Sequence, residues 1–332
     1  MRDEASSLLT VADSAEQWVR KFGDLNVRTA VTIGNFDGVH LGHQRIFQAV
    51  NDWVGLKGNL HKKQEQLTPT VLTFYPHPAK VLRPADAPQL LCTLSQRLAE
   101  FESAGMHAAL VLKFDEQLAK VSAEDFARTY LVDTLCARAV FVGANFRFGH
   151  KQAGDVKLLE EFGRRWDFDV HVVPPVIQDG IVVSSTAVRC AVREGRMEDA
   201  LRLLGRRFAL AGEIKTGTGQ GHQLVVPTLN LATEQECLPK NGVYATESVI
   251  AGKKYRSATN IGVRPTFDGQ RLAIESHLFD FSDTLTSGTM EVRFWKRLRD
   301  EKKFSGPEAL RDQVLRDIGE AQAYFASLAQ PK

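Results

Sequence analysis

Up to about residue 190, short apolar runs alternate with amphipathic stretches. The runs are rich in β-branched and aromatic residues, which favours buried strands over helices. Between them, apolar residues recur at helical spacing. This alternation predicts an α/β domain with a Rossmann-like parallel sheet and helices on both faces. The predicted strands are Ala30–Ile33, Val71–Phe74, Ala108–Phe114, Ala139–Val142 and Val170–Val173, and the predicted helices are His43–Val54, Ala123–Leu135 and Asp155–Trp166.

The pattern changes after Leu204. From Arg207 to Arg297, strand-like segments are separated by turn residues such as Ala251-Gly252 and Ser287-Gly288, and a helical pattern returns at Pro307–Leu328. Successive short strands followed by a late helix predict an antiparallel β-barrel with a terminal helix. We therefore predict one domain at 1–190, a linker helix region at 191–205, and a barrel domain at 206–332.

The net charge and the spacing of the cysteines argue against several classes of function. The 332 residues carry 42 basic and 40 acidic side chains, a net charge of +2. With such a balance, the protein has no strong overall positive potential that would attract a nucleic acid, so an anionic ligand must be bound by a few nearby groups. The four cysteines form no Cys-x-x-Cys pair, which indicates neither a zinc site nor a redox motif. With no apolar leader and no membrane span expected, we expect a cytoplasmic protein without a membrane partner.

The most informative stretch runs from Gly34 to His43, with the sequence Gly-Asn-Phe-Asp-Gly-Val-His-Leu-Gly-His. It follows a predicted strand and opens a predicted helix, whose free amides form an anion site. Its glycines allow close backbone approach to a ligand. Two histidines three residues apart stand beside that site, which suits phosphate transfer. A tight turn with two surface histidines is the alternative.

Two later segments allow two interpretations each. Phe146-Arg147-Phe148 follows a predicted strand end, where ligands bind in open α/β sheets, but it is also consistent with a buried aromatic pair and a surface arginine. Ser184-Ser185-Thr186 begins a predicted helix and is first of all an N-cap. Its hydroxyls and amides can also bind phosphate oxygens, with Arg189 one turn inside the helix.

The second half carries weaker signals. The glycine-rich loop with Gly217, Gly219 and Gly221 is not followed by Gly-Lys-Ser/Thr, so it is not a P-loop and can be a flexible turn. Thr228 and Asn230, two residues apart, point to the same face of a strand. Both offer the oxygen donors that Mg²⁺ accepts.

Together these motifs resemble the bacterial bifunctional riboflavin kinase and FAD synthetase family. The His-x-Gly-His element is similar to the signature of nucleotidyltransferases. The order of the motifs along the chain also resembles that of the family: first the longer form Gly-Asn-Phe-Asp-Gly-Val-His-Leu-Gly-His-Gln, then the Pro-His-Pro loop and the later motifs. The resemblance implies catalytic roles for His40 and His43. It implies that ATP and the flavin are bound by Gly34, Phe36, Asp37, Gly38, Gly42, His77, Asn145, Phe146, Arg147, Ser184, Ser185, Thr186, Arg189, Gly217, Gly219 and Gly221.

The resemblance extends into the second half. Pro-Thr-Leu-Asn at 227–230 is similar to the riboflavin kinase element Pro-Thr-x-Asn, which implies that Thr228 and Asn230 hold Mg²⁺. Glu275 matches the family's glutamate, the implied base for the ribityl hydroxyl. Strand alternation places Ile274 and Leu278 on one face and Glu275 on the other, so a solvated carboxylate outside the barrel is the alternative.

The family's loop usually carries arginines and Leu-Gly-Phe before Pro-Thr, whereas Gln220, His222 and 224–226 (Leu-Val-Val) stand here. The expected activity is ATP-dependent conversion of riboflavin to FMN by the barrel and of FMN to FAD, with release of pyrophosphate, by the first domain. Because of the altered loop, a monofunctional FMN adenylyltransferase with a flavin-binding barrel stays the alternative, and a flavin-binding module without turnover is a further one. The expected partners are riboflavin, FMN and ATP, and a weak homo-oligomer is left open.

Overall fold

The computed structural model describes residues 9–23, 27–60, 66–215, 226–266, 269–283 and 285–329. Contacts divide the chain into two units, Met1–Pro88 with Leu94–Val183, and Gln89–Thr93 with Ser184–Lys332. The predicted limit at residue 190 lies inside helix α7 (Ser185–Arg193). This helix packs against α8 (Met197–Leu204), so the structure places both helices, and with them the predicted linker, in the second unit.

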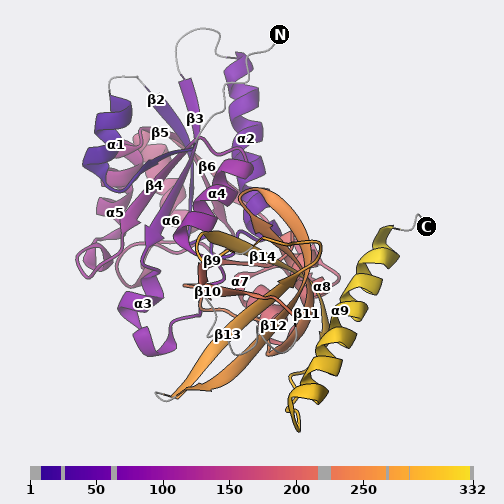
Figure 1. Ribbon diagram of the computed structural model, residues 1–332. Helices are drawn as coiled ribbons and strands as arrows, with labels where there is room; N and C mark the ends of the chain where they lie inside the picture. Colours follow the sequence, from indigo (N-terminus) through magenta and orange to yellow (C-terminus); the bar gives the residue numbers. More distant parts are fainter. Residues whose placement is uncertain are drawn as a thin grey trace. The chain divides into compact units, whose positions relative to one another are not determined.

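The first unit is built on a parallel sheet of six strands in the order β1-β4-β3-β2-β5-β6 (Figure 1). This confirms the predicted α/β class, and five of the strands match predicted runs. Strand β1 was missed because three residues are too few to show periodicity. The strands are β1 (Thr10–Ala12), β2 (Val27–Ile33), β3 (Gln66–Tyr75), β4 (Ala108–Lys113), β5 (Ala137–Gly143) and β6 (Asp169–Val173).

Alternate residues of each strand belong to two cores, one on each face of the sheet. Val31 and Ile33 pack with aromatic side chains such as Trp18 and Phe162 on one face, whereas Ala30 packs with Phe47 on the other. This alternation buries the sheet on both faces. The helices are α1 (Ala15–Phe22), α2 (Leu41–Leu60), α3 (Pro78–Leu82), α4 (Leu94–Ser103), α5 (Ala123–Phe126), continued by a π-helical segment η4 (Ala127–Thr134), and α6 (Val156–Trp166).

The strand order reverses between β2 and β5. From β2 the chain proceeds through β3 to β4 on one side, and β5 and β6 extend the sheet on the other. Parallel strands end at the same edge, and ligands in open α/β sheets bind at this reversal. The loops that follow β2 and β5 are therefore neighbours. They contain the two most informative predicted motifs of this unit.

The second unit is a closed antiparallel barrel in the order β10-β13-β12-β11-β14-β9, as predicted (Figure 1). Closure pairs β9 with β10, so the described sheet has no free edge. The strands are β9 (Ala209–Lys215), β10 (Leu229–Thr233), β11 (Gly242–Ile250), β12 (Lys253–Thr266), β13 (Gly269–Leu278) and β14 (Thr289–Arg299), and the terminal helix is α9 (Pro307–Ala329).

The barrel interior is partly polar. The hydroxyl groups of five fully buried residues form one chain of hydrogen bonds with oxygen–oxygen distances of 2.6 to 3.0 Å. Because each hydroxyl has a partner inside the barrel, its burial carries no unsatisfied group. The chain ties β11, β12 and β13 together. Its members are Ser248, Ser257, Thr246, Thr259 and Ser276.

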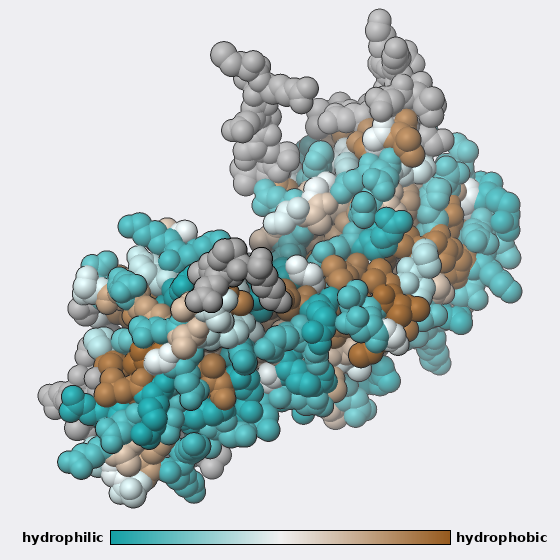
Figure 2. Space-filling model, turned by 90° about the vertical axis from the view of Figure 1, so that its right-hand side faces the viewer, coloured by the Kyte–Doolittle hydropathy of each residue, from teal (hydrophilic) through white to brown (hydrophobic). Residues whose placement is uncertain are grey.

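Helix α9 covers part of the barrel's outer face. Phe325 and Ala321 pack against Ala245 and Ala258. Surface hydrophobic residues elsewhere are scattered, and the face in Figure 2 is mainly hydrophilic with small separate hydrophobic areas. The contact with α9 thus buries apolar side chains that the strand pattern places outside the barrel.

A buried ion pair also attaches α9 to the barrel. Arg299 of β14 donates from Nε and Nη2 to the two carboxylate oxygens of Asp317, at 2.7 and 2.6 Å. Asp317 is 4% exposed, and Gln313 donates a further hydrogen bond to it at 2.8 Å. Removing one partner of such a pair leaves the other charge buried and uncompensated.

Asp317→Ala is expected to lower the free energy of unfolding by about 3–5 kcal/mol, because Arg299 loses its carboxylate. Asp312→Ala is the matched control, since Asp312 lies exposed on the same helix and should change stability by less than about 0.5 kcal/mol. Thermal unfolding followed by circular dichroism compares the two variants. Equal melting temperatures would contradict the structural role of the pair.

Candidate active sites

The loop after β2 joins the strand to helix α2 in the space of seven residues. Helix α2 begins at Leu41, earlier than predicted, so the backbone amides of its first turn lie directly beyond the loop. Phe36, Asp37 and His40 are buried, whereas Gly34 and Gly42 are half-buried. A loop that delivers backbone amides to a helix N-terminus favours bound anions such as phosphate.

The two predicted catalytic histidines lie against each other. The His40 and His43 rings are stacked, with centroids 3.6 Å apart and planes at 20°. The backbone amide of His43 donates to Nδ1 of His40 at 3.4 Å. Because Nδ1 accepts, the proton of neutral His40 is on Nε2, which can donate to an oxyanion. The edge of Phe36 supports the His43 ring at 5.1 Å.

Gly42 is required by the position of His40. A Cβ atom at residue 42 would lie 3.0 Å from Cε1 and 3.1 Å from Nδ1 of His40. It would also lie 3.6 Å from the carbonyl oxygen of Val183. A side chain here therefore displaces the imidazole ring from the start of α2.

The Pro-His-Pro loop follows β3, the neighbour of β2 in the sheet. Its Tyr75–Pro76 peptide bond is cis. Nδ1 of His77 accepts a hydrogen bond from the amide of Ala79 at 3.1 Å, so His77 caps the short helix α3. Its predicted contact with the nucleotide stays a prediction.

The loop after β5 exposes Asn145 and Arg147 at the reversal of strand order. Phe148 is buried in the core, and Phe146 stacks on it with centroids 5.4 Å apart. Arg147 forms an exposed ion pair with Asp155 at 3.5 Å. Phe148 is therefore a core residue, as the alternative of a buried aromatic pair expects. Asn145, Phe146 and Arg147 are more accessible, and their contact with a ligand stays a prediction.

Ser184 caps helix α7, because its hydroxyl accepts from the amide of Ala187 at 3.2 Å. This confirms the N-cap interpretation. Ser184, Ser185, Thr186 and Arg189 belong to the second unit by their contacts. Their binding of ATP phosphates stays a prediction.

Sequence reasoning missed Arg97, which lies on α4 and is only 5% exposed. Its Nη1 donates to the carbonyl oxygen of Asn35 at 2.5 Å. It also lies 3.4 Å from Thr73 Oγ1 and from the carbonyl oxygen of Phe74. The sequence around Arg97, Leu94–Ser103, contains no motif that would have singled it out, because its burial is visible only in the structure.

The second candidate site lies on the barrel's outer face. Asn230 of β10 is directly opposite Glu275 of β13, and Glu275 is directly opposite Asn260 of β12. Directly opposed residues on adjacent strands point to the same face. The inward neighbours Ile274 and Ser276 are buried, so Glu275 lies outside the core, as predicted. Asn260 was not among the predicted site residues.

His277 fixes the segment that precedes β10. Its Nδ1 lies 2.8 Å from the carbonyl oxygen of Pro227, fifty residues away in sequence. Pro227 adjoins Thr228, which is half-buried and two residues from Asn230. Asn230 faces the same side of the sheet as Glu275, and that Thr228 does so too stays a prediction. The predicted loop residues Gly217, Gly219 and Gly221 lie outside the described residues.

Within the described part of the chain, no group of three or more His, Cys, Asp or Glu side chains is placed to hold a metal ion. The hydroxyl of Thr228 and the amide oxygen of Asn230 are hard oxygen donors beside a carboxylate. This donor set fits Mg²⁺, which keeps several waters and is usually bound together with substrate phosphates.

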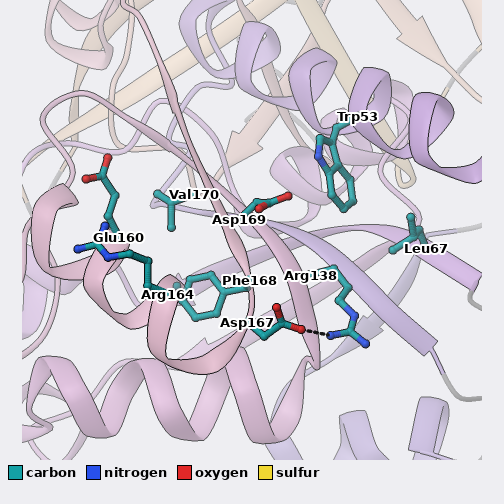
Figure 3. Close-up of a pocket in the computed structure, with 10 residues that line it drawn as sticks. Trp53, Leu67, Arg138, Glu160, Arg164, Asp167, Phe168, Asp169 and Val170 are labelled. Carbon is teal, nitrogen blue, oxygen red and sulfur yellow. Dashed lines mark hydrogen bonds and ion pairs between the residues drawn. The ribbon is translucent and has the colours of Figure 1, made fainter. Parts of the chain in front are cut away.

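A cleft of about 640 Å³ lies at the other edge of the parallel sheet, at the amino ends of its strands (Figure 3). Trp53 and Leu67 stand on one side, and Arg138 is paired with Asp167 at 3.3 Å. None of the predicted site residues is among its lining residues. This cleft therefore lies at the opposite edge of the sheet from the predicted site, which we expect at the carboxyl ends of the strands.

Comparison with known proteins finds a match for each half of the chain. A family model of FAD synthetase matches residues 24–187, and one of riboflavin kinase matches residues 204–325. A bifunctional riboflavin kinase/FMN adenylyltransferase of Escherichia coli K12 is 33% identical over 89% of this chain and 92% of its own length. One of Pseudomonas fluorescens is 36% identical, covering 90% and 93%. The chain belongs to this bifunctional family.

The match to both family models supports the bifunctional interpretation over the monofunctional alternative. A crystal structure described as a macrolide-efflux protein of Streptococcus pneumoniae is also similar, with a TM-score of 0.80 and 26% identity. It covers 95% of this chain and 99% of its own. In the described part of this chain, no helix is both long and apolar enough to cross a membrane.

Gly42→Ala is expected to lower the rate of FAD formation from FMN and ATP by about tenfold or more, because the new Cβ displaces His40. Gly55→Ala is the matched control on the same helix. A Cβ there meets no atom within 4 Å, and the change should preserve activity and add up to about 1 kcal/mol of stability. Similar FAD formation by both variants would contradict the steric requirement at residue 42.

Proposed function

We propose that the first unit transfers AMP from ATP to FMN, and that the barrel phosphorylates riboflavin to FMN with a second ATP. The observation that carries the first assignment is the stacked His40–His43 pair at the N-terminus of α2, beside the reversal of strand order. Oriented amides and imidazole donors at a helix start suit a reaction in which charge builds up on phosphate oxygens.

In adenylyl transfer, an FMN phosphate oxygen attacks the α-phosphorus of ATP. The bond from that phosphorus to the oxygen bridging the β-phosphate breaks, and pyrophosphate leaves. His40, with its proton on Nε2, and His43 stabilise the negative charge on the transferring and leaving groups. No covalent intermediate with the protein is needed. Asn145, Phe146 and Arg147 hold the nucleotide and flavin, and Ser185, Thr186 and Arg189 hold the β- and γ-phosphates.

In the barrel, Glu275 accepts the proton of the ribityl 5′-hydroxyl as its oxygen attacks the γ-phosphorus of ATP, and ADP leaves. The supporting observation is the row of Asn230, Glu275 and Asn260 across three strands, which brings the carboxylate beside amide groups outside the core. Thr228 and Asn230 would hold Mg²⁺, which neutralises phosphate charge when it is bound.

Cytoplasmic location is part of this proposal. None of the four cysteines forms a disulfide bond. This holds even for Cys92 and Cys237, which are both buried in the second unit. Free thiols are typical of a reducing compartment, where ATP is also supplied.

His40→Ala together with His43→Ala is expected to abolish FAD formation from FMN and ATP, with a loss of at least about 100-fold, because the phosphate charge loses both donors. Riboflavin phosphorylation by the same sample should be retained, which shows that the second unit is folded, and circular dichroism compares the overall fold of the variant with that of the wild type. Chromatographic separation of riboflavin, FMN and FAD measures both reactions. Unchanged FAD formation would overturn the assignment of the histidines.

Glu275→Gln is expected to lower FMN formation from riboflavin by about 100-fold or more, because the amide cannot accept the hydroxyl proton. FAD formation from supplied FMN should persist. Glu213→Gln is the control, since Glu213 is exposed on β9 of the same barrel and pairs with Lys215 at the surface. Equal kinase rates for the two variants would show that Glu275 is only a solvated carboxylate.

A further inference from the structure

The loop that carries His40 has an unusual backbone. Phe36, Gly38 and Val39 have φ angles of 51°, 80° and 39°, all in the left-handed region. Glycine adopts this region freely, but it is uncommon for phenylalanine and an outlier for a β-branched valine. For Phe36 and Val39 this conformation costs on the order of 1–3 kcal/mol each, and it persists only when the surroundings hold it. The loop therefore needs specific restraints.

Side-chain burial provides part of that restraint. Phe36 packs against Phe47 and Phe101, with ring centroids 5.1 and 5.7 Å away. Val39 is fully buried. These contacts anchor two side chains, but apolar packing does not fix the direction of the peptide groups, which must present amides to a phosphate.

Two long side chains hold the carbonyl groups at either end of the strained segment. Arg97 of α4 donates to the carbonyl oxygen of Asn35 at 2.5 Å, and Gln44 of α2 donates from Nε2 to that of Val39 at 2.9 Å. The two carbonyls flank the three left-handed residues. A carbonyl that is held fixes the direction of the following amide, because the peptide group is planar.

The guanidinium group of Arg97 contributes both hydrogen bonds and a positive charge to the loop. Its Nη1 also reaches Thr73 and Phe74 at the end of β3, so one guanidinium joins the loop after β2 to the neighbouring strand. At 5% exposure its charge is screened little by water and favours anions at the loop. A lysine would keep the charge but present no fork of fixed donors.

We propose that Arg97 and Gln44 are positioning residues for adenylyl transfer, which hold the strained loop so that its amides and His40 face the phosphates. Neither touches the reacting atoms. The inference rests on the proposed adenylyltransferase activity. It assigns a function to a buried arginine and to a helix glutamine that the chemistry of the site does not use directly.

The test compares Arg97→Lys, Gln44→Glu and the control Gln48→Glu in FAD formation from FMN and ATP. Glutamate has the shape of glutamine but cannot donate to the Val39 carbonyl when ionised. Gln48 is exposed one turn further along α2, so the same exchange there leaves the loop untouched. Both loop variants should lose roughly 10- to 100-fold in kcat, with a smaller change in KM for ATP and FMN.

Arg97→Ala adds a readout that general destabilisation would not produce. Millimolar guanidinium chloride should restore part of its FAD formation, while urea at the same concentration should not, because urea also donates hydrogen bonds but lacks the positive charge. The wild-type rate tests the proposed function, and the ratio of variant to wild type tests the inference. Thermal unfolding of the same samples reports on folding of the chain, and riboflavin phosphorylation reports on the second unit alone.

Two results would overturn the inference. One is a kcat for Gln44→Glu and Arg97→Lys within about threefold of the Gln48→Glu control. The other is a loss of FAD formation that matches the loss of folded protein in thermal unfolding, so that the activity of each folded molecule is unchanged.

Discussion

The first unit depends on the hydrogen-bonded register of β2 between β3 and β5. Because all three strands are parallel, their carboxyl ends meet at one edge of the sheet. The loops that follow them are then neighbours, although they lie far apart along the chain. The same register buries alternate side chains of β2 in two cores, which makes this edge rigid enough to hold a strained loop.

A different constraint organises the second unit. Barrel closure separates two faces, and a hydroxyl chain satisfies the polar groups inside while Asn230, Glu275 and Asn260 align outside. A one-residue slip of β13 would turn Glu275 into the barrel and Ser276 out of it. The interior hydrogen bond between Thr259 and Ser276 therefore supports the register on which the exterior row depends.

In the proposed mechanism, each site binds phosphate groups through a few nearby donors and charges, and not through the long-range electrostatic field of the whole protein. The net charge of +2 provides no long-range attraction for phosphates. In the mechanism proposed above, the first unit uses a helix N-terminus, two imidazoles and one buried guanidinium, whereas the barrel combines oxygen donors with a carboxylate. This difference follows the chemistry, since adenylyl transfer needs charge stabilisation and phosphorylation of an alcohol also needs a proton acceptor.

The sequence by itself determined the strand and helix pattern, the α/β-plus-barrel class and the motifs around His40, His43 and Glu275, because these depend on local periodicity and on contiguous residues. It did not show strand β1, whose three residues are too few for a periodic pattern, or the role of Arg97, whose partners lie in the loop after β2 and on β3. Only the tertiary structure decided which residues oppose Glu275 and which side chains hold the loop after β2. Strand register and long-range hydrogen bonds join residues that have no fixed spacing along the chain.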